Sequence, residues 1–182
     1  MDPISQLDEV MPLLKGMVAK LDADQLDSQT PCENFDVRGV LEHMIGGATM
    51  FAAAFRGEAP PAAPPSGDPL VLFPKALDDL LASMKAPGAL DKTIAAPFGE
   101  VPGEVFARFV ALDGVVHGWD IATATGQAYD PPAAIVADAE GFAREALGDD
   151  MRDGDTFKVA TEVPADATPI EKLVAFTGRT VS

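Results

Sequence analysis

The chain has 182 residues, 47% of them hydrophobic and 23% charged, which is typical of a globular protein and not of a disordered one. Its 13 basic and 29 acidic side chains give a formal net charge of −16, and so acidic a protein repels phosphate backbones, which argues against a nucleic-acid partner. The N-terminus lacks a basic leader, no apolar run has membrane-spanning length, and Cys32 has no second cysteine to pair with. We therefore predict a soluble, cytoplasmic protein with one domain over residues 1–182 and no membrane contact.

The first two thirds of the chain contain four segments whose apolar residues recur at helical intervals. Asp2 and Asp36 are good N-caps for the first two of these helices, and Gly126 is a good end for the fourth. The proline-rich linker at 57–69 connects helices and does not separate domains, because the pieces on either side are too small to fold alone. A weakly alternating stretch at 93–103 predicts extended segments or a small hairpin. The predicted helices cover residues 3–21, 37–56, 72–84 and 106–126.

The last third of the chain predicts two more helices and one extended segment. A helix is expected over residues 130–147, and Thr168 with Glu171 forms a capping box for a short helix that stops at Gly178. Residues 156–163 have the alternation of an extended segment. Helices dominate, so we predict a mainly all-α fold, a four-helix bundle with short extended segments and extra C-terminal helices.

An acidic side chain lies on the interior face of the fourth predicted helix. Asp113 and His117 are one helical turn apart on an otherwise apolar stripe, and His43 lies on an apolar face of the second helix. An unpaired carboxylate in a core costs several kcal/mol, so Asp113 needs a partner. Pairing with His117 alone is one solution, but it leaves His43 without a role. A divalent metal bound by all three explains each of them, and the spacing alone leaves both interpretations open.

Five glycines surround these residues on their helices, although each costs about 1 kcal/mol of helix propensity relative to alanine. They make room either for a ligand or for close packing of helices, and the sequence does not separate these two explanations. The five are Gly39, Gly46, Gly47, Gly114 and Gly118.

For four other residues, a functional role competes with a simpler structural one. Cys32 precedes a helix N-terminus, where the helix dipole favours a thiolate, but a structural role is more common for such a cysteine. Asp120 either orients His117 or lies exposed, and Arg179 either binds a substrate carboxylate or, more often at such a position, forms a salt bridge. Trp119 points away from His117 and is expected to serve in packing.

Two stretches of the chain resemble a known group of proteins, in the same order. DGVVHGWD, residues 113–120, resembles the D-x-x-x-H-x-W-D signature of the mycothiol-dependent maleylpyruvate isomerase-like proteins, in the DinB/YfiT-like superfamily. TPCENFDVRGVLEHM, residues 30–44, is similar to the element in which a T-P-C segment leads into the helix with the first ligand histidine. GEVPG before the fourth helix and the closing FTGR are similar to this group as well.

This resemblance implies a DinB-like four-helix core in which His43, Asp113 and His117 hold a divalent metal, with zinc first and nickel as the alternative. Asp113 stands where isomerases of the group have glutamate, and Phe35 stands where tryptophan is usual. The isomerases proper are longer and carry a second, C-terminal domain, so we expect a substrate other than maleylpyruvate.

Three protein ligands leave one coordination position free, as in catalytic zinc sites. The resemblance therefore predicts a low-molecular-weight thiol such as mycothiol as metal-bound nucleophile, in transfer to or isomerisation of a small electrophile. The alternatives are a metal-dependent hydrolase that activates water, a non-enzymatic metal- or ligand-binding stress-response module, and a plain bundle with core histidines. The expected partner is a small-molecule substrate. A homodimer is left open, and no catalytic residue is assigned.

Overall fold

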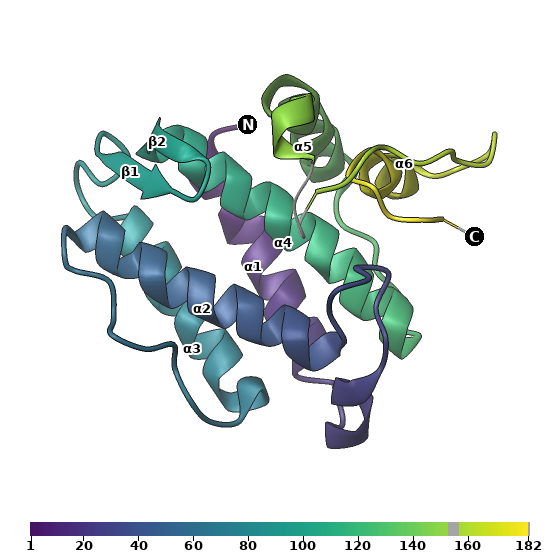
Figure 1. The fold of residues 1–182 in the computed structure, drawn as a ribbon, viewed down its shortest axis with the longest axis horizontal. Helices are drawn as coiled ribbons and strands as arrows, with labels where there is room; N and C mark the ends of the chain where they lie inside the picture. Colours follow the sequence, from purple (N-terminus) through teal and green to yellow (C-terminus); the bar gives the residue numbers. More distant parts are fainter. Residues whose placement is uncertain (153–156, 182) are drawn as a thin grey trace.

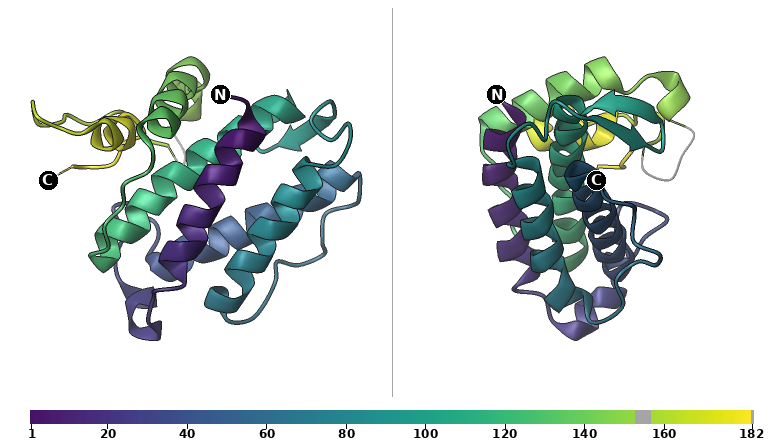
Figure 2. Two further views of the ribbon diagram at one scale, coloured as in Figure 1. Left: turned by 180° about the vertical axis from the view of Figure 1, so that it is seen from behind. Right: turned by 90° about the vertical axis from the view of Figure 1, so that its left-hand side faces the viewer.

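The computed structural model describes residues 1–152 and 157–181. In this part of the chain four long helices lie side by side as a bundle, and a hairpin and two further helices adjoin it (Figures 1 and 2). Helices α2 and α3 pack against each other, α1 packs against α3 and α4, and α2 meets α4 across the bundle. The predicted, mainly helical architecture is confirmed. The bundle helices are α1 (Pro3–Val18), α2 (Val37–Arg56), α3 (Pro69–Met84) and α4 (Gly103–Thr125).

The ends of α2 and α4 lie where the sequence places them. The Asp36 carboxylate accepts a hydrogen bond from the backbone N–H of Gly39 at 2.7 Å, which caps the start of α2. Gly57 and Gly126 follow α2 and α4 with φ angles of 78° and 67°, a left-handed conformation that glycine adopts at little cost.

Helix α3 begins three residues earlier than the sequence predicted. The carboxylate of Asp68 accepts from the backbone N–H of Leu70 at 3.0 Å, and Pro69 takes the first helical position, where its missing N–H costs nothing. Pro74 therefore lies inside the helix and not in its first turn. The predicted linker is accordingly one residue shorter than 57–69.

The predicted hairpin forms between α3 and α4. Strands β1 (Thr93–Ala96) and β2 (Gly99–Pro102) pair antiparallel, with Ile94 opposite Val101, and β2 leads directly into α4. The hairpin therefore lies at the N-terminal end of α4, beside the end of the bundle (Figure 1).

The C-terminal part adds α5 (Ala133–Ala146) and α6 (Pro169–Phe176), which lie on the side of α4 away from α3 (Figures 1 and 2). The capping box of α6 is present, because Thr168 and Glu171 bond each other's backbone N–H groups. The described residues also form two short 3-10 helices, η1 (Ala23–Asp27) and η2 (Asp149–Met151).

The extended segment predicted at 156–163 is not a strand over 157–163, and residue 156 lies outside the described residues. The backbone N–H groups of Lys158 and Thr161 instead donate to the carbonyls of Thr177 and Ala175, at 3.1 and 2.9 Å. These acceptors belong to the end of a helix, where carbonyls do not repeat at strand spacing, so no ladder follows. The two bonds hold this segment beside the residues that follow α6.

Apolar side chains from all four bundle helices meet in a common core. Leu7, Leu41, Phe73 and Leu112, one from each helix, are at most 1% exposed. Among the helices the structure describes, none is long and apolar enough to cross a membrane.

Candidate metal centre

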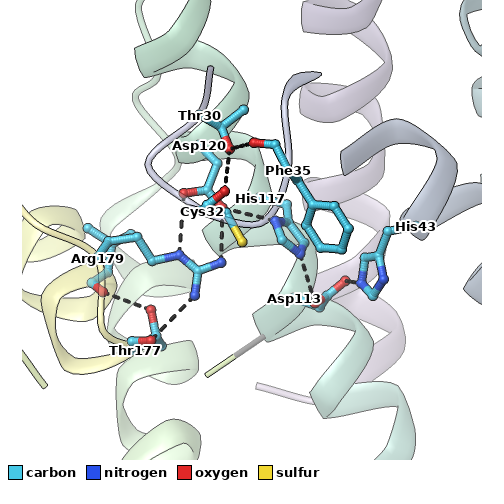
Figure 3. A network of polar contacts seen from close by, with 10 residues as sticks. Thr30, Cys32, Phe35, His43, Asp113, His117, Asp120, Thr177 and Arg179 are labelled. Atoms are coloured by element: carbon cyan, nitrogen blue, oxygen red, sulfur yellow. Dashed lines mark hydrogen bonds and ion pairs between the residues drawn. The ribbon is translucent and has the colours of Figure 1, made fainter. Parts of the chain in front are cut away.

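The three residues predicted as metal ligands lie together between α2 and α4 (Figure 3). Nε2 of His43 is 3.8 Å from Oδ2 of Asp113, and Nε2 of His117 is 3.4 Å from Oδ1 of the same carboxylate. The two imidazole rings are 5.2 Å apart, edge to face. One candidate ligand atom from each residue lies within 4.8 Å of the other two. Helix α4 supplies two of them because positions four apart share a face, and α2 supplies the third from across the bundle.

The orientation of His117 is fixed from one side of its ring. Its side chain is 1% exposed, and Nδ1 lies 2.9 Å from Oδ2 of Asp120, one turn further along α4. The ionised Asp120 can only accept, so the proton of a neutral His117 is on Nδ1 and Nε2 carries a lone pair. Asp120 was predicted either to orient His117 or to lie exposed, and the structure shows the first arrangement.

Asp120 is itself paired with Arg179, which follows α6. The guanidinium contacts both carboxylate oxygens, at 3.0 and 3.3 Å, and the two side chains are 0% and 3% exposed. The salt bridge predicted for Arg179 is therefore present, but it is buried and reaches the candidate metal centre through Asp120 and His117 (Figure 3). The pairing of these two residues could not be predicted from the sequence, because 59 positions separate them.

The Nε2 atom of His117 is buried and has no hydrogen-bond partner among the described residues. It faces the Asp113 carboxylate, so a lone pair and an anion point at each other. In a self-satisfied Asp113–His117 pair Nε2 would carry a second proton, yet its 3.4 Å contact with Oδ1 of Asp113 is not a hydrogen bond. A cation between Nε2 and the carboxylate would satisfy both, and the donor set of two imidazoles and one carboxylate is typical of zinc.

The two carboxylates of the centre are ionised, although burial by the surrounding protein opposes the charge on each. Burial alone would raise the pKa of Asp113, but the imidazoles of His117 and His43 outweigh it and lower the pKa to about 2. The pKa of Asp120 is also lowered, because the hydrogen bond from His117 and the charge of Arg179 exceed the effect of burial. The Asp113 carboxylate raises the pKa of His43. Both carboxylates are therefore ionised at neutral pH, and the oxygens of Asp113 are in the charge state that a metal ligand needs.

A second group of potential ligands, Cys32, His117 and Asp120, lies on the other side of His117. Burial raises the pKa of the Cys32 thiol, so the thiolate that a metal needs is disfavoured. Asp120 is also already engaged by His117 and Arg179, and a second cation next to the guanidinium would be repelled. We therefore place the candidate centre at His43, Asp113 and His117.

The loop that contains Cys32 contributes to the centre in another way, because it holds Phe35 against His43. The hydroxyl of Thr30 lies within hydrogen-bond distance of the Cys32 and Phe35 carbonyls, and the N–H of Phe35 donates to the Cys32 carbonyl at 2.8 Å. This tight turn places the Phe35 ring against His43, with ring centres 5.5 Å apart and planes 29° from parallel (Figure 3). The arrangement restrains the ring of His43 at the position where it faces Asp113.

The five glycines near the centre do not share one explanation. An added Cβ would lie 2.9 Å from Phe35 at Gly39, 3.0 Å from Val10 at Gly114 and 2.5 Å from Tyr129 at Gly118, so these three permit close packing. At Gly46 and Gly47 an added Cβ would meet nothing within 4 Å. Trp119, as expected, packs against the core.

A cavity of about 460 Å³ opens beside the centre. His43 and Asp113 form part of its wall, and so does Gly47, one turn beyond His43 on α2. Its volume is within the range of small-molecule sites, roughly 300–1,000 Å³. His43 and Asp113, two of the three candidate ligands, are thus accessible from a space that a small molecule can enter.

Known proteins place the chain in a family. Residues 7–122 match the family model described as the mycothiol maleylpyruvate isomerase N-terminal domain. The chain is 33% identical over 184 residues to the uncharacterized proteins MT0763 and Rv0738 of Mycobacterium tuberculosis strains CDC 1551 and H37Rv, and the match covers 100% of each chain. No solved structure matches significantly. With its helical DinB-like fold and a family match over more than half its length, the chain belongs to the mycothiol maleylpyruvate isomerase N-terminal domain family.

Proposed function

We propose that this protein is a divalent-metal enzyme, with His43, Asp113 and His117 as its ligands and a low-molecular-weight thiol as its nucleophile. The observation that carries the proposal is the buried, unpartnered Nε2 of His117, which faces the ionised carboxylate of Asp113. Zinc is the first candidate and nickel the second, because both accept imidazole nitrogen and carboxylate oxygen. A bound metal would supply an open coordination position at which a thiol loses its proton at neutral pH.

The protein's own residues give this centre its geometry. Asp120 holds the Nδ1 proton of His117, which keeps the Nε2 lone pair directed at the centre, and Arg179 keeps Asp120 ionised in a buried position. Phe35 restrains the ring of His43. The adjacent cavity would hold the electrophile next to the nucleophile, against a mainly apolar wall.

The family supports the thiol, since the description of its model names mycothiol. The reaction class is transfer of the thiol to an electrophile, or addition and elimination that isomerises it. A reduced thiol as cosubstrate requires a reducing compartment, so we place this activity in the cytoplasm.

Metal content tests the ligand set. The purified protein is expected to bind about one zinc or nickel ion per chain with high affinity, and His43→Ala or His117→Ala is expected to abolish binding while the helical circular-dichroism signal remains. Cys32→Ser is the control for the second group of ligands and is expected to keep the metal. Metal retained by the double histidine variant, or lost from Cys32→Ser alone, would contradict the assignment.

Cobalt substitution tests the thiol. Addition of mycothiol to the cobalt protein is expected to produce a sulfur-to-metal charge-transfer band, and consumption of an electrophile is expected only with metal and thiol together. Turnover that is independent of thiol would identify a water-activating hydrolase instead. A metal-loaded protein with neither the band nor turnover would be a metal-binding module.

A further inference from the structure

The wall of the cavity beside the centre is almost entirely apolar. It lies inside the bundle, between α1, α2, α3 and α4, and reaches the tip of the β1–β2 hairpin and the segment around η2. Representative wall residues from these elements are Met11, Phe51, Leu77, Phe98, Phe109 and Phe157. A small molecule that reaches the candidate ligands therefore lies against aliphatic and aromatic side chains.

The charges on this wall have one sign. The carboxylates of Asp113 and Asp150 line the cavity, and among its described wall residues there is no lysine or arginine. His43 is the single basic side chain there, and it faces Asp113. With the metal's open coordination position taken by the thiol, a substrate with one or two carboxylates would find no lysine or arginine among the described wall residues to pair with, and its charge would be desolvated beside other anions.

The size of the cavity sets the size of its occupant. A cavity of roughly 150 Å³ lined by aliphatic and aromatic side chains holds one benzene molecule. The volume here, about 460 Å³, is about three times as large. It therefore accommodates a molecule of two or three rings, or an acyl chain of similar volume.

We infer that the electrophile of this enzyme is a neutral, predominantly apolar molecule of two to three rings' volume, and not a small dicarboxylate. This inference rests on the proposed function for the reaction itself, but the preference of the cavity can be measured without turnover. In the simplest case, a neutral aryl halide, the thiolate forms a sulfur–carbon bond and the carbon–halogen bond breaks. The halide leaves with its electron pair, the thiol proton goes to solvent, and no oxidant or reductant is needed.

Gly47 offers a way to fill the cavity without disturbing the fold. It lines the cavity, an added Cβ would meet nothing within 4 Å, and replacing glycine inside a helix gains helix propensity. Its neighbour Gly46 is equally half-buried on α2 and also open at Cβ, but it is not part of the cavity wall. Gly47→Leu and Gly46→Leu are therefore a matched pair that differs in whether the new side chain enters the cavity.

Two fluorescent dyes with the same skeleton test the preference. Phenylnaphthylamine is neutral and has three rings, whereas anilinonaphthalene sulfonate carries one added negative charge. We expect the chelator-treated protein to bind the neutral dye at least about tenfold more tightly, since the sulfonate lacks a cation and faces two carboxylates. Gly47→Leu is expected to weaken binding of the neutral dye by about tenfold or more, and Gly46→Leu is expected to leave it unchanged. Equal or tighter binding of the sulfonate, or equal effects of the two leucines, would overturn the inference.

A second pair of compounds distinguishes a failure of this inference from a failure of the proposed function. Chlorodinitrobenzene is a neutral aryl halide, and chlorodinitrobenzoate is its anionic analogue. With metal and thiol present, we expect consumption of the neutral compound at a kcat/KM at least about tenfold higher. Equal consumption of both would overturn the inference and leave the thiol-dependent reaction standing. If neither metal nor thiol binds, the proposed function fails, and the dye measurement still decides what the cavity accepts.

Discussion

Replacing Asp120 with asparagine tests whether the buried Arg179–Asp120 pair positions a metal ligand. The wild-type carboxylate accepts from Nδ1 of His117 at 2.9 Å and from the guanidinium at 3.0 and 3.3 Å. An asparagine of the same shape has one accepting oxygen, so its amide N–H₂ faces either Nδ1 of His117 or the Nε–H of Arg179. In both cases Nδ1 of His117 loses its ionised acceptor. The substitution also leaves the charge of Arg179 buried without a counter-charge.

Two effects of different size follow from this change. Loss of one partner of a buried ion pair costs about 3–5 kcal/mol, so the free energy of unfolding is expected to fall by that amount. Loss of the partner that orients a ligand histidine costs about 10–100-fold in metal affinity. Urea denaturation of the metal-free protein measures the first effect, and competition with a chromophoric chelator measures the second.

Asp138→Asn is the matched control for this variant. Asp138 lies on α5 and contacts the N-terminal amino group at 2.7 Å and Arg108 at 3.7 Å, in a partly exposed position away from the centre. Its replacement is expected to cost at most about 1 kcal/mol and to leave metal affinity unchanged. An Asp120→Asn protein that is destabilised but binds metal as tightly as the wild type would refute the positioning role, because the pair would then serve stability alone.

Three smaller predictions concern α4, the loop before α5, and α6. Tyr129 is the single tyrosine and burial raises its pKa, so tyrosinate absorbance is expected to appear well above pH 10 in the folded protein and at about pH 10 in urea. The unfolded state then loses its proton first, so the free energy of unfolding should fall as pH rises above about 10, and Tyr129→Phe should remove that slope. Gly118→Ala would place a Cβ 2.5 Å from the Tyr129 hydroxyl oxygen, and urea denaturation should show a loss of about 1–3 kcal/mol. Thr168→Ala removes the α6 cap and should lower stability by about 1 kcal/mol, without changing metal affinity. A Tyr129 that titrates near pH 10 in the folded protein, or a neutral Gly118→Ala, would show that this contact is looser than described.

Local signals in the sequence were sufficient for most of the helices and for the three candidate ligands. Helix α2 begins after Asp36 and ends at Arg56, as predicted, because capping depends on residues within one turn of the helix end. His43, Asp113 and His117 stood out because each polar side chain interrupts an apolar helical face, and the structure brings all three together. Which cation, if any, they bind is not a property of spacing, and it stays a prediction.

Long-range features could not be found in this way. The Arg179–Asp120 pair joins positions on α4 and after α6, and nothing in either neighbourhood specifies the other. The segment at 157–163 has strand-like alternation, but its hydrogen-bond acceptors are at a helix end, so tertiary contacts decided against a strand. The contact of Gly118 with Tyr129 likewise arises from packing between α4 and the loop before α5.

The position of α4 explains why its sequence pattern alone was ambiguous. The helix contacts α1, α2, α5, α6 and the hairpin, so nearly its whole circumference is buried and apolar residues occur on every face. On this surface, Gly114 contacts α1 and Gly118 contacts Tyr129. Asp120 pairs with Arg179, and Asp113 and His117 face α2. The ligand geometry is therefore held by neighbours on all sides, since any shift of α4 toward one of them disturbs its contact with another. A site built on such a helix is positioned more precisely than one built on a loop, which is what a centre with three ligands and one open position requires.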